Sequence, residues 1–155
     1  MKSLFLKQFA FEHWSNSLIL ENLQSISNPP ERPVVLLSHI ISSHCMWLNR
    51  VTKTEMICTL FQERTLEECK KQMDENLTGW IAFLESTSED AFSNEIEFMA
   101  AWEANPSKRK ISLQDALIHL INHSSYHRGQ IVSQIKGLLE PLPLTNYIMY
   151  SSEII

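Results

Sequence analysis

The spacing of apolar residues predicts two long helices in the first third of the chain. Between Leu4 and Ile26 apolar positions recur every three or four residues, the pattern of a helix with one core-facing side. Asn28-Pro29-Pro30 ends this helix, because consecutive prolines remove hydrogen-bond donors and disfavour a helical residue before them. A second stripe with the same period begins after Glu31 and runs to about Thr52.

A loop and a third helix follow. Residues 53–63 show no clear period, which predicts a loop with a short turn. Thr65, followed by Glu67 and Glu68, has the pattern of a helix N-cap with an acidic first turn. We expect this helix to run to about Ser86.

A fourth helix is predicted to start at Ser112. Ser112 and Asp115 resemble a capping box with Asp in place of Glu, and the apolar residues after them keep helical spacing. Gly137 is a natural C-cap and marks the expected end. Residues 91–110, between the third and fourth helices, predict an irregular hairpin or excursion. Residues 145–150 form an apolar tail that we expect to dock on the helices.

These four apolar stripes predict an all-α protein with one domain over residues 1–155. A length of 155 residues fits one domain, and only 3 glycines argue against folds that are rich in hairpins. A four-helix bundle is the simplest arrangement that buries four such stripes, with the irregular excursion between its third and fourth helices.

Charge and composition exclude several classes of partner. A net charge of -5 has the wrong sign for a surface that follows nucleic-acid phosphates, so we expect no nucleic-acid partner. Apolar runs are far shorter than the ~20 residues of a membrane span, and the first residues are amphipathic rather than a signal peptide. We therefore expect a cytoplasmic protein with no membrane partner. Cys45, Cys58 and Cys69 are odd in number and widely spaced, which predicts reduced, mostly buried thiols.

Three histidines of the fourth helix lie four residues apart: His119, His123 and His127. Because a step of four turns the helix by about 40°, consecutive members share one face. Two imidazoles at this spacing can bind one metal ion, although the Glu of the zincin motif is missing. The alternative is a polar helix face or a set of hydrogen-bonded core histidines. Gly129 in mid-helix costs about 1 kcal/mol against Ala, which indicates a close approach by another helix or a ligand.

The second helix adds His39 and His44. A step of five places them about 140° apart, so they cannot both face one site. His39 lies nearer the apolar stripe, which favours it modestly as the inward one. His119 and His127 are separated by about 12 Å along the fourth helix, too far apart for both to bind one ion easily. These steps leave the choice between His39 and His44 open.

Four stretches that span most of the chain form a recognisable set. They are Phe11-Glu-His-Trp14-Ser-Asn16, the stretch from Leu37-Ser-His39 through Trp47-Leu-Asn-Arg50, the stretch from His119 to Gln130, and Thr145-Asn-Tyr-Ile148. This set resembles the DinB family of the DinB/YfiT-like superfamily, which contains metal-dependent proteins. The segment His123-Ser-Ser-Tyr-His-Arg-Gly-Gln130 is its most specific part.

The resemblance implies a four-helix bundle, frequently dimeric, with a divalent metal held by His39, His123 and His127. We accordingly expect a homodimer, and we expect His13, His44 and His119 not to bind the metal. Asn146 stands where the family often has Asp. This difference bears on any role of that carboxylate and leaves the expected metal site unchanged. Family members of known activity are thiol-dependent transferases or isomerases.

Three neutral imidazoles leave a divalent ion with an open position, as in catalytic rather than structural sites. We expect zinc or nickel, although imidazole also suits copper and iron. The expected function is that of a metal-dependent enzyme that activates water or a thiol for hydrolysis or thiol transfer on a small molecule. The alternative is a non-catalytic, stress-related metal-binding or interaction module. Tyr126 and Gln130 are the candidates for catalytic or substrate-binding groups, whereas Arg128 is expected to pair with an acid.

Overall fold

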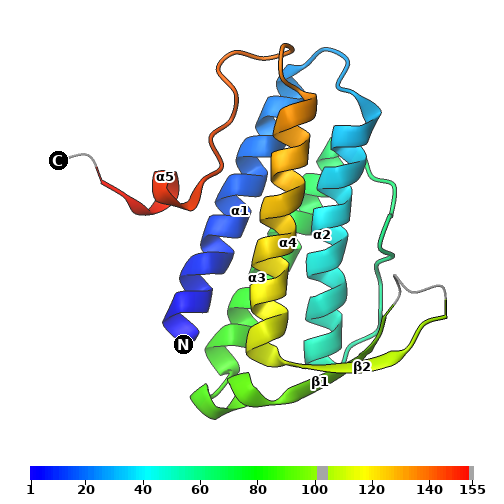
Figure 1. Ribbon diagram of the computed structural model, residues 1–155, viewed down its shortest axis with the longest axis vertical. Helices are drawn as coiled ribbons and strands as arrows, with labels where there is room; N and C mark the ends of the chain where they lie inside the picture. The colour runs from blue at the N-terminus through cyan, green and yellow to red at the C-terminus, as the bar shows by residue number, and fades with distance from the viewer. Residues whose placement is uncertain (101–104, 154–155) are drawn as a thin grey trace.

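The computed structural model describes residues 1–100 and 105–153, which are mostly helical (Figure 1). The four long helices lie side by side: α1 (Lys2–Ser25), α2 (Glu31–Thr52), α3 (Leu66–Ser86) and α4 (Leu113–Gln134). The shorter elements are the 3-10 helix η1 (Glu89–Ser93), the strands β1 (Glu95–Met99) and β2 (Lys108–Ser112), and the helix α5 (Tyr147–Ser151). The four long helices correspond to the four apolar stripes.

Side chains near the ends of α3 and α4 fix where these helices start. The Thr65 hydroxyl accepts a hydrogen bond from the Glu68 N–H, and the Glu68 carboxylate accepts one from the Thr65 N–H. The Ser112 hydroxyl accepts from the Asp115 N–H at 3.2 Å and donates to the Asp115 carboxylate at 2.7 Å. Each cap satisfies a backbone donor that has no partner inside the helix. Both predicted helix starts are confirmed.

The segment between α3 and α4 forms a hairpin at the end of the helices where α4 begins (Figure 1). β1 and β2 pair antiparallel, with Glu95 opposite Ser112 and Met99 opposite Lys108. The expectation of a hairpin over residues 91–110 is confirmed for the described part, and residues 101–104 lie outside it. The hairpin brings Phe98 to within 5.3 Å of the Trp47 ring on α2, measured between ring centroids.

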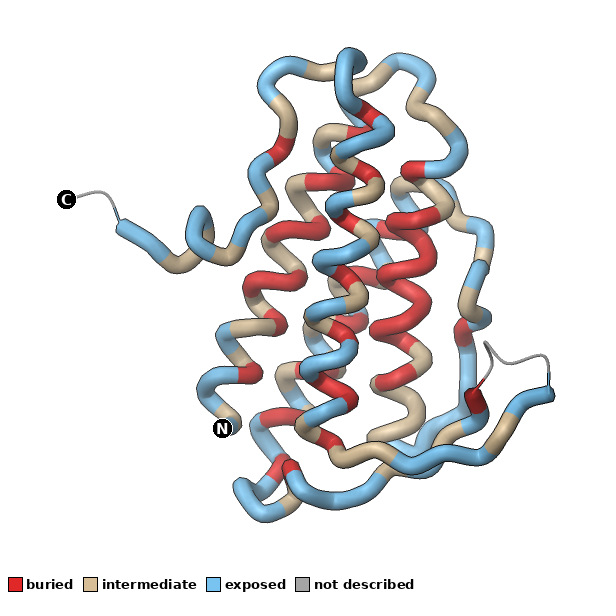
Figure 2. The backbone as a smooth tube through the Cα atoms, viewed as in Figure 1, coloured by how far each residue is buried: buried red, intermediate tan, exposed pale blue. Residues whose placement is uncertain are grey.

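Two apolar clusters form the core, one toward each end of the long helices. Figure 2 shows the buried positions spread along all four helices. One cluster includes Leu23, Leu37 and Ile131, and the other includes Phe9, Trp80 and Leu117. Several buried residues at mid-height of the helices are polar instead: Glu12, Asn16, His44, Asn76, Ser124 and Arg128. A polar layer therefore separates the two clusters.

An ion pair between Glu12 and Arg128 dominates this polar layer. The Arg128 guanidinium donates to both Glu12 carboxylate oxygens, at 2.8 and 2.9 Å, and also to the Asn16 side-chain oxygen at 3.1 Å. Both charged side chains are almost fully buried. Burial by itself raises the pKa of Glu12, but hydrogen bonds from His44 and Arg128 outweigh it and hold that pKa below its usual value. The prediction that Arg128 pairs with an acid is confirmed.

The C-terminal tail docks on α1, as predicted. The Phe11 ring lies 5.1 Å from the Tyr147 ring and 5.7 Å from the Tyr150 ring. The Trp14 ring lies 5.6 Å from the Tyr150 ring. Aromatic contacts thus hold α5 against the outer side of α1.

No other described helix approaches Gly129, and α4 does not reach Gly137 as predicted. Gly129 lies on the exposed side of the helix, and a Cβ added there would meet no described atom within 4 Å. No neighbouring helix approaches it closely, so no packing contact explains this glycine. The helix ends at Gln134 rather than near Gly137, which lies in the following turn with a φ of +86°.

We predict that Gly129→Ala stabilises the protein by about 0.5 to 1 kcal/mol, because Ala is the better helix former and the added methyl group has room. Urea unfolding followed by circular dichroism measures the change. Gly137→Ala is the matched control and should destabilise, because its positive φ is strained for any residue with a Cβ. A loss of stability in Gly129→Ala contradicts the open surroundings of this residue.

Candidate metal site

Three imidazoles converge between α2 and α4. His39 comes from α2, and His123 and His127 lie one turn apart on α4. One ring nitrogen of each lies within 4.8 Å of the others, and the ring centroids are 4.5 to 4.8 Å apart. Two nitrogens on a tetrahedral zinc ion lie about 3.4 Å apart, for bonds of about 2.1 Å. Small side-chain adjustments therefore suffice, and the cluster is compatible with metal binding.

The loop between α2 and α3 orients His39. The His39 Nδ1–H donates to the Leu60 carbonyl at 2.9 Å. The Phe61 ring stacks on the imidazole, with the two ring centroids 4.4 Å apart. With the proton held at Nδ1, the lone pair is at Nε2, which lies 3.0 Å from His123 Nε2. Leu60 and Phe61 could not be predicted from the sequence, because they belong to a loop without a period.

Gln130 orients His127 in the same way. The His127 Nδ1–H donates to the Gln130 side-chain oxygen at 2.9 Å, three residues further along α4. Gln130 therefore contacts the cluster through His127. Tyr126 is 65% exposed, and its ring lies 5.0 Å from the His127 ring. Both residues singled out from the sequence thus lie beside the cluster.

The pKa of His123 is lowered strongly by its surroundings. Burial, and to a smaller extent positive charge on the neighbouring His127 and His39, lowers the pKa of His123 to about 3. Burial also lowers the pKa of His39. Both rings are therefore neutral near pH 7, which is the form that binds metal. His123 Nδ1 is buried and has no hydrogen-bond partner among the described residues.

The structure places His13 and His44 elsewhere. The Nε2 atom of His44 lies 3.0 Å from the Ser124 hydroxyl in the polar layer. The Nε2 atom of His13 lies 2.8 Å from an Asp74 carboxylate oxygen, between α1 and α3. His39 and His44 are both buried but face different sites, as the step of five residues predicted.

A pocket of about 450 Å³ opens beside the cluster. His39 and His123 form part of its wall, and His119 lies in the same wall, with its ring 5.5 Å from that of His123. The remaining lining is mainly apolar: Ser43, Met46, Trp47, Arg50, Leu60, Phe61, Phe98, Met99 and Ile111. Two of the three clustered histidines are thus accessible to a small molecule.

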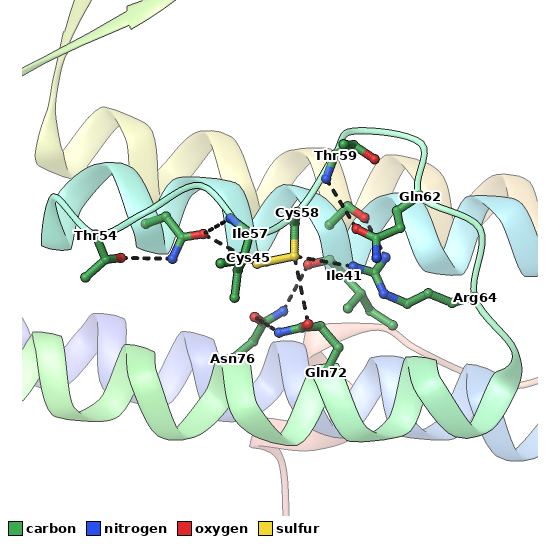
Figure 3. The surroundings of a disulfide bond; sticks show 12 residues. Ile41, Cys45, Thr54, Ile57, Cys58, Thr59, Gln62, Arg64, Gln72 and Asn76 are labelled. Carbon is green, nitrogen blue, oxygen red and sulfur yellow. Dashed lines mark hydrogen bonds between the residues drawn. A yellow bond between two sulfur atoms is a disulfide. The ribbon is translucent and has the colours of Figure 1, made fainter.

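A disulfide joins the loop to α2 (Figure 3). Cys45 on α2 and Cys58 in the loop are bonded, with Cα atoms 6.3 Å apart. The prediction of reduced thiols is wrong for this pair, because the loop folds back along α2, which their spacing in the sequence does not reveal. Cys69 is free and buried, as predicted.

Hydrogen bonds from Arg64 hold the other end of the loop. Its guanidinium donates to the Ser38 hydroxyl at 2.9 Å and to the Ser42 hydroxyl at 2.6 Å, both on α2. Leu60 and Phe61, which orient His39, lie between the disulfide and Arg64 along the chain. The loop is therefore fastened to α2 on both sides of the residues that touch the cluster (Figure 3).

The fold and the cluster define a class: mostly helical proteins with three converging histidines that are compatible with metal binding. The sequence model of the DinB family matches residues 4–152, nearly the whole chain, and the chain belongs to the DinB family. A search of curated proteins found no match. Among the described residues, no helix has both the length and the apolar character needed to cross a membrane.

We predict that Cys58→Ser lowers the free energy of unfolding by up to about 3 kcal/mol, because the crosslink restricts a short loop of the unfolded chain. Denaturant unfolding with and without dithiothreitol measures this effect. Reductant should bring the wild type to the stability of Cys58→Ser and leave the variant unchanged. Equal stability of the two proteins without reductant contradicts the crosslink.

Proposed function

We propose that this chain is a metal-dependent enzyme, built as one four-helix-bundle domain of the DinB/YfiT-like type over residues 1–155. In this proposal His39, His123 and His127 hold a divalent ion, zinc or nickel. The observation that carries it is the convergence of three imidazoles in which two rings have their Nδ1 protons held by neighbours. Oriented, neutral imidazoles are what a metal site requires.

When bound, a divalent ion supplies Lewis acidity that lowers the pKa of a water or a thiol toward neutrality, for hydrolysis or thiol transfer. Leu60 and Gln130 keep the His39 and His127 rings in place. The apolar pocket walls exclude water from the reacting groups. The exposed Tyr126 hydroxyl is available to bind a substrate, and Gln130 acts through His127.

The pocket favours an enzyme over a non-catalytic, stress-related module. Small-molecule sites are concave and mostly apolar, with volumes from about 300 Å³ upward. The pocket beside His39 and His123 has a volume of about 450 Å³ and a mainly apolar wall. A module that only bound metal or a partner protein would leave this pocket without a role.

Two further expectations remain proposals. We propose a homodimer, on the resemblance to a family whose members are frequently dimeric. We also propose a cytoplasmic location, where the Cys45–Cys58 disulfide would be an exception to the usual reduced state of cysteines.

We predict that changing His39, His123 or His127 singly to Ala removes most of the bound metal, because each change removes one of three ligands. The protein is purified without an affinity tag or chelator, reloaded with zinc or nickel, and its metal content measured by elemental analysis. His44→Ala and His119→Ala are the matched controls and should retain close to one ion per chain.

Circular dichroism of each variant separates loss of metal from loss of folding. Full metal content in His39→Ala, with loss in His44→Ala or His119→Ala, contradicts the proposed set of ligands. A wild type that takes up neither ion contradicts the proposed function itself.

We predict that the purified protein sediments as a dimer, with twice the chain mass of 18.0 kDa. Sedimentation equilibrium at micromolar concentration measures this directly. A mass near that of one chain rejects the homodimer and leaves the metal site untouched.

A further inference from the structure

Arg50 places a positive charge in the apolar pocket beside the histidine cluster. It lies in the last turn of α2 and lines the same pocket as His39 and His123. Its guanidinium carbon lies 4.8 Å from the centroid of the Trp47 ring and 5.9 Å from that of the Phe98 ring. These two rings hold the half-buried side chain at the pocket wall.

The Arg50 guanidinium has no acidic partner among the described residues. No described carboxylate lies within 4.0 Å of it, whereas the fully buried Arg128 is paired with Glu12. Burial lowers the pKa of Arg50, and no nearby acid offsets this effect. Its positive charge in turn lowers the pKa of His119, which burial already lowers. The group remains charged at neutral pH, because an arginine pKa is so high.

Removing a cation from water costs free energy, which an acidic partner offsets. Where the chain provides no acid, a ligand can supply the negative charge. Planar guanidinium groups bind carboxylates and phosphates with two parallel hydrogen bonds. Most of the other lining residues are apolar, and two of them are exposed hydrophobic side chains: Phe61 at 59% and Met99 at 51%. The pocket thus combines one cation, a large apolar wall and three imidazoles.

We propose that this pocket binds a molecule with an apolar body and a single anionic group, which pairs with Arg50 while another part of the molecule reaches His39 and His123. The inference deepens the proposed function by naming the chemical class of its substrate. Recognition of the anion by Arg50 does not itself require the metal. The two ideas can therefore be tested apart.

The test uses metal-free full-length protein and three probes of one shape: 4-phenylbutyrate, 4-phenylbutanamide and 4-phenylbutylammonium. Isothermal titration calorimetry measures the affinity of each probe. We expect the carboxylate to bind roughly tenfold more tightly than the neutral amide, as expected for one charge-assisted pair, and the ammonium to bind weakest. Working without metal prevents the carboxylate from binding to an ion instead.

Arg50→Met should abolish the preference for the carboxylate and leave the affinity for the amide within about twofold, because Met keeps the apolar stem. Arg50→Lys should keep part of the preference, since it keeps the charge. Lys53→Gln is the matched control: it removes an exposed positive charge from the same end of α2 and should leave the preference intact.

Equal binding of carboxylate and amide by the wild type overturns the inference, even if Arg50→Met does not fold. A preference that persists in Arg50→Met, or that is lost equally in Lys53→Gln, also overturns it. Metal uptake is measured on the same preparations. A carboxylate preference without metal uptake supports this inference and contradicts the proposed function, whereas metal uptake without the preference contradicts this inference alone.

Discussion

The buried ion pair between Glu12 and Arg128 sets how α4 is rotated against α1. Arg128 points into the polar layer, where it reaches both carboxylate oxygens of Glu12. His127 precedes Arg128 by one residue and is therefore turned about 100° around the helix, with His123 on nearly the same side. The loss of either charged partner would leave the other charge buried and alone, at a cost of about 3 to 5 kcal/mol. A slip of α4 that moved its histidines away from α2 would break this pair.

The histidine cluster depends equally on the loop between α2 and α3. Its carbonyl at Leu60 and its ring at Phe61 fix the orientation of His39, which α2 alone would leave free to rotate. The Cys45–Cys58 disulfide and the hydrogen bonds of Arg64 hold that loop against α2. Leu60 and Phe61 of the same loop also line the pocket. The loop therefore determines both the orientation of His39 and the shape of the pocket.

Arg128 and Arg50 differ in how their charge is balanced. Arg128 finds its acid within the chain and stabilises the packing of the helices. Arg50 is held by the aromatic rings of Trp47 and Phe98, which lower the cost of its position without neutralising it. The charge of Arg128 is thus neutralised within the chain, whereas no described acid neutralises that of Arg50.

The sequence alone determined the features that arise within about four residues of chain, since helical period and capping act over that range. It predicted the four long helices, the caps at Thr65 and Ser112, and the shared face of His123 and His127. The choice of His39 came from the family resemblance rather than from the spacing. Only the tertiary structure decided contacts between distant segments: Glu12 as the partner of Arg128, the Leu60 carbonyl on His39, the Cys45–Cys58 bond and the open surroundings of Gly129. These depend on how whole helices and a patternless loop pack in space, which no local period records.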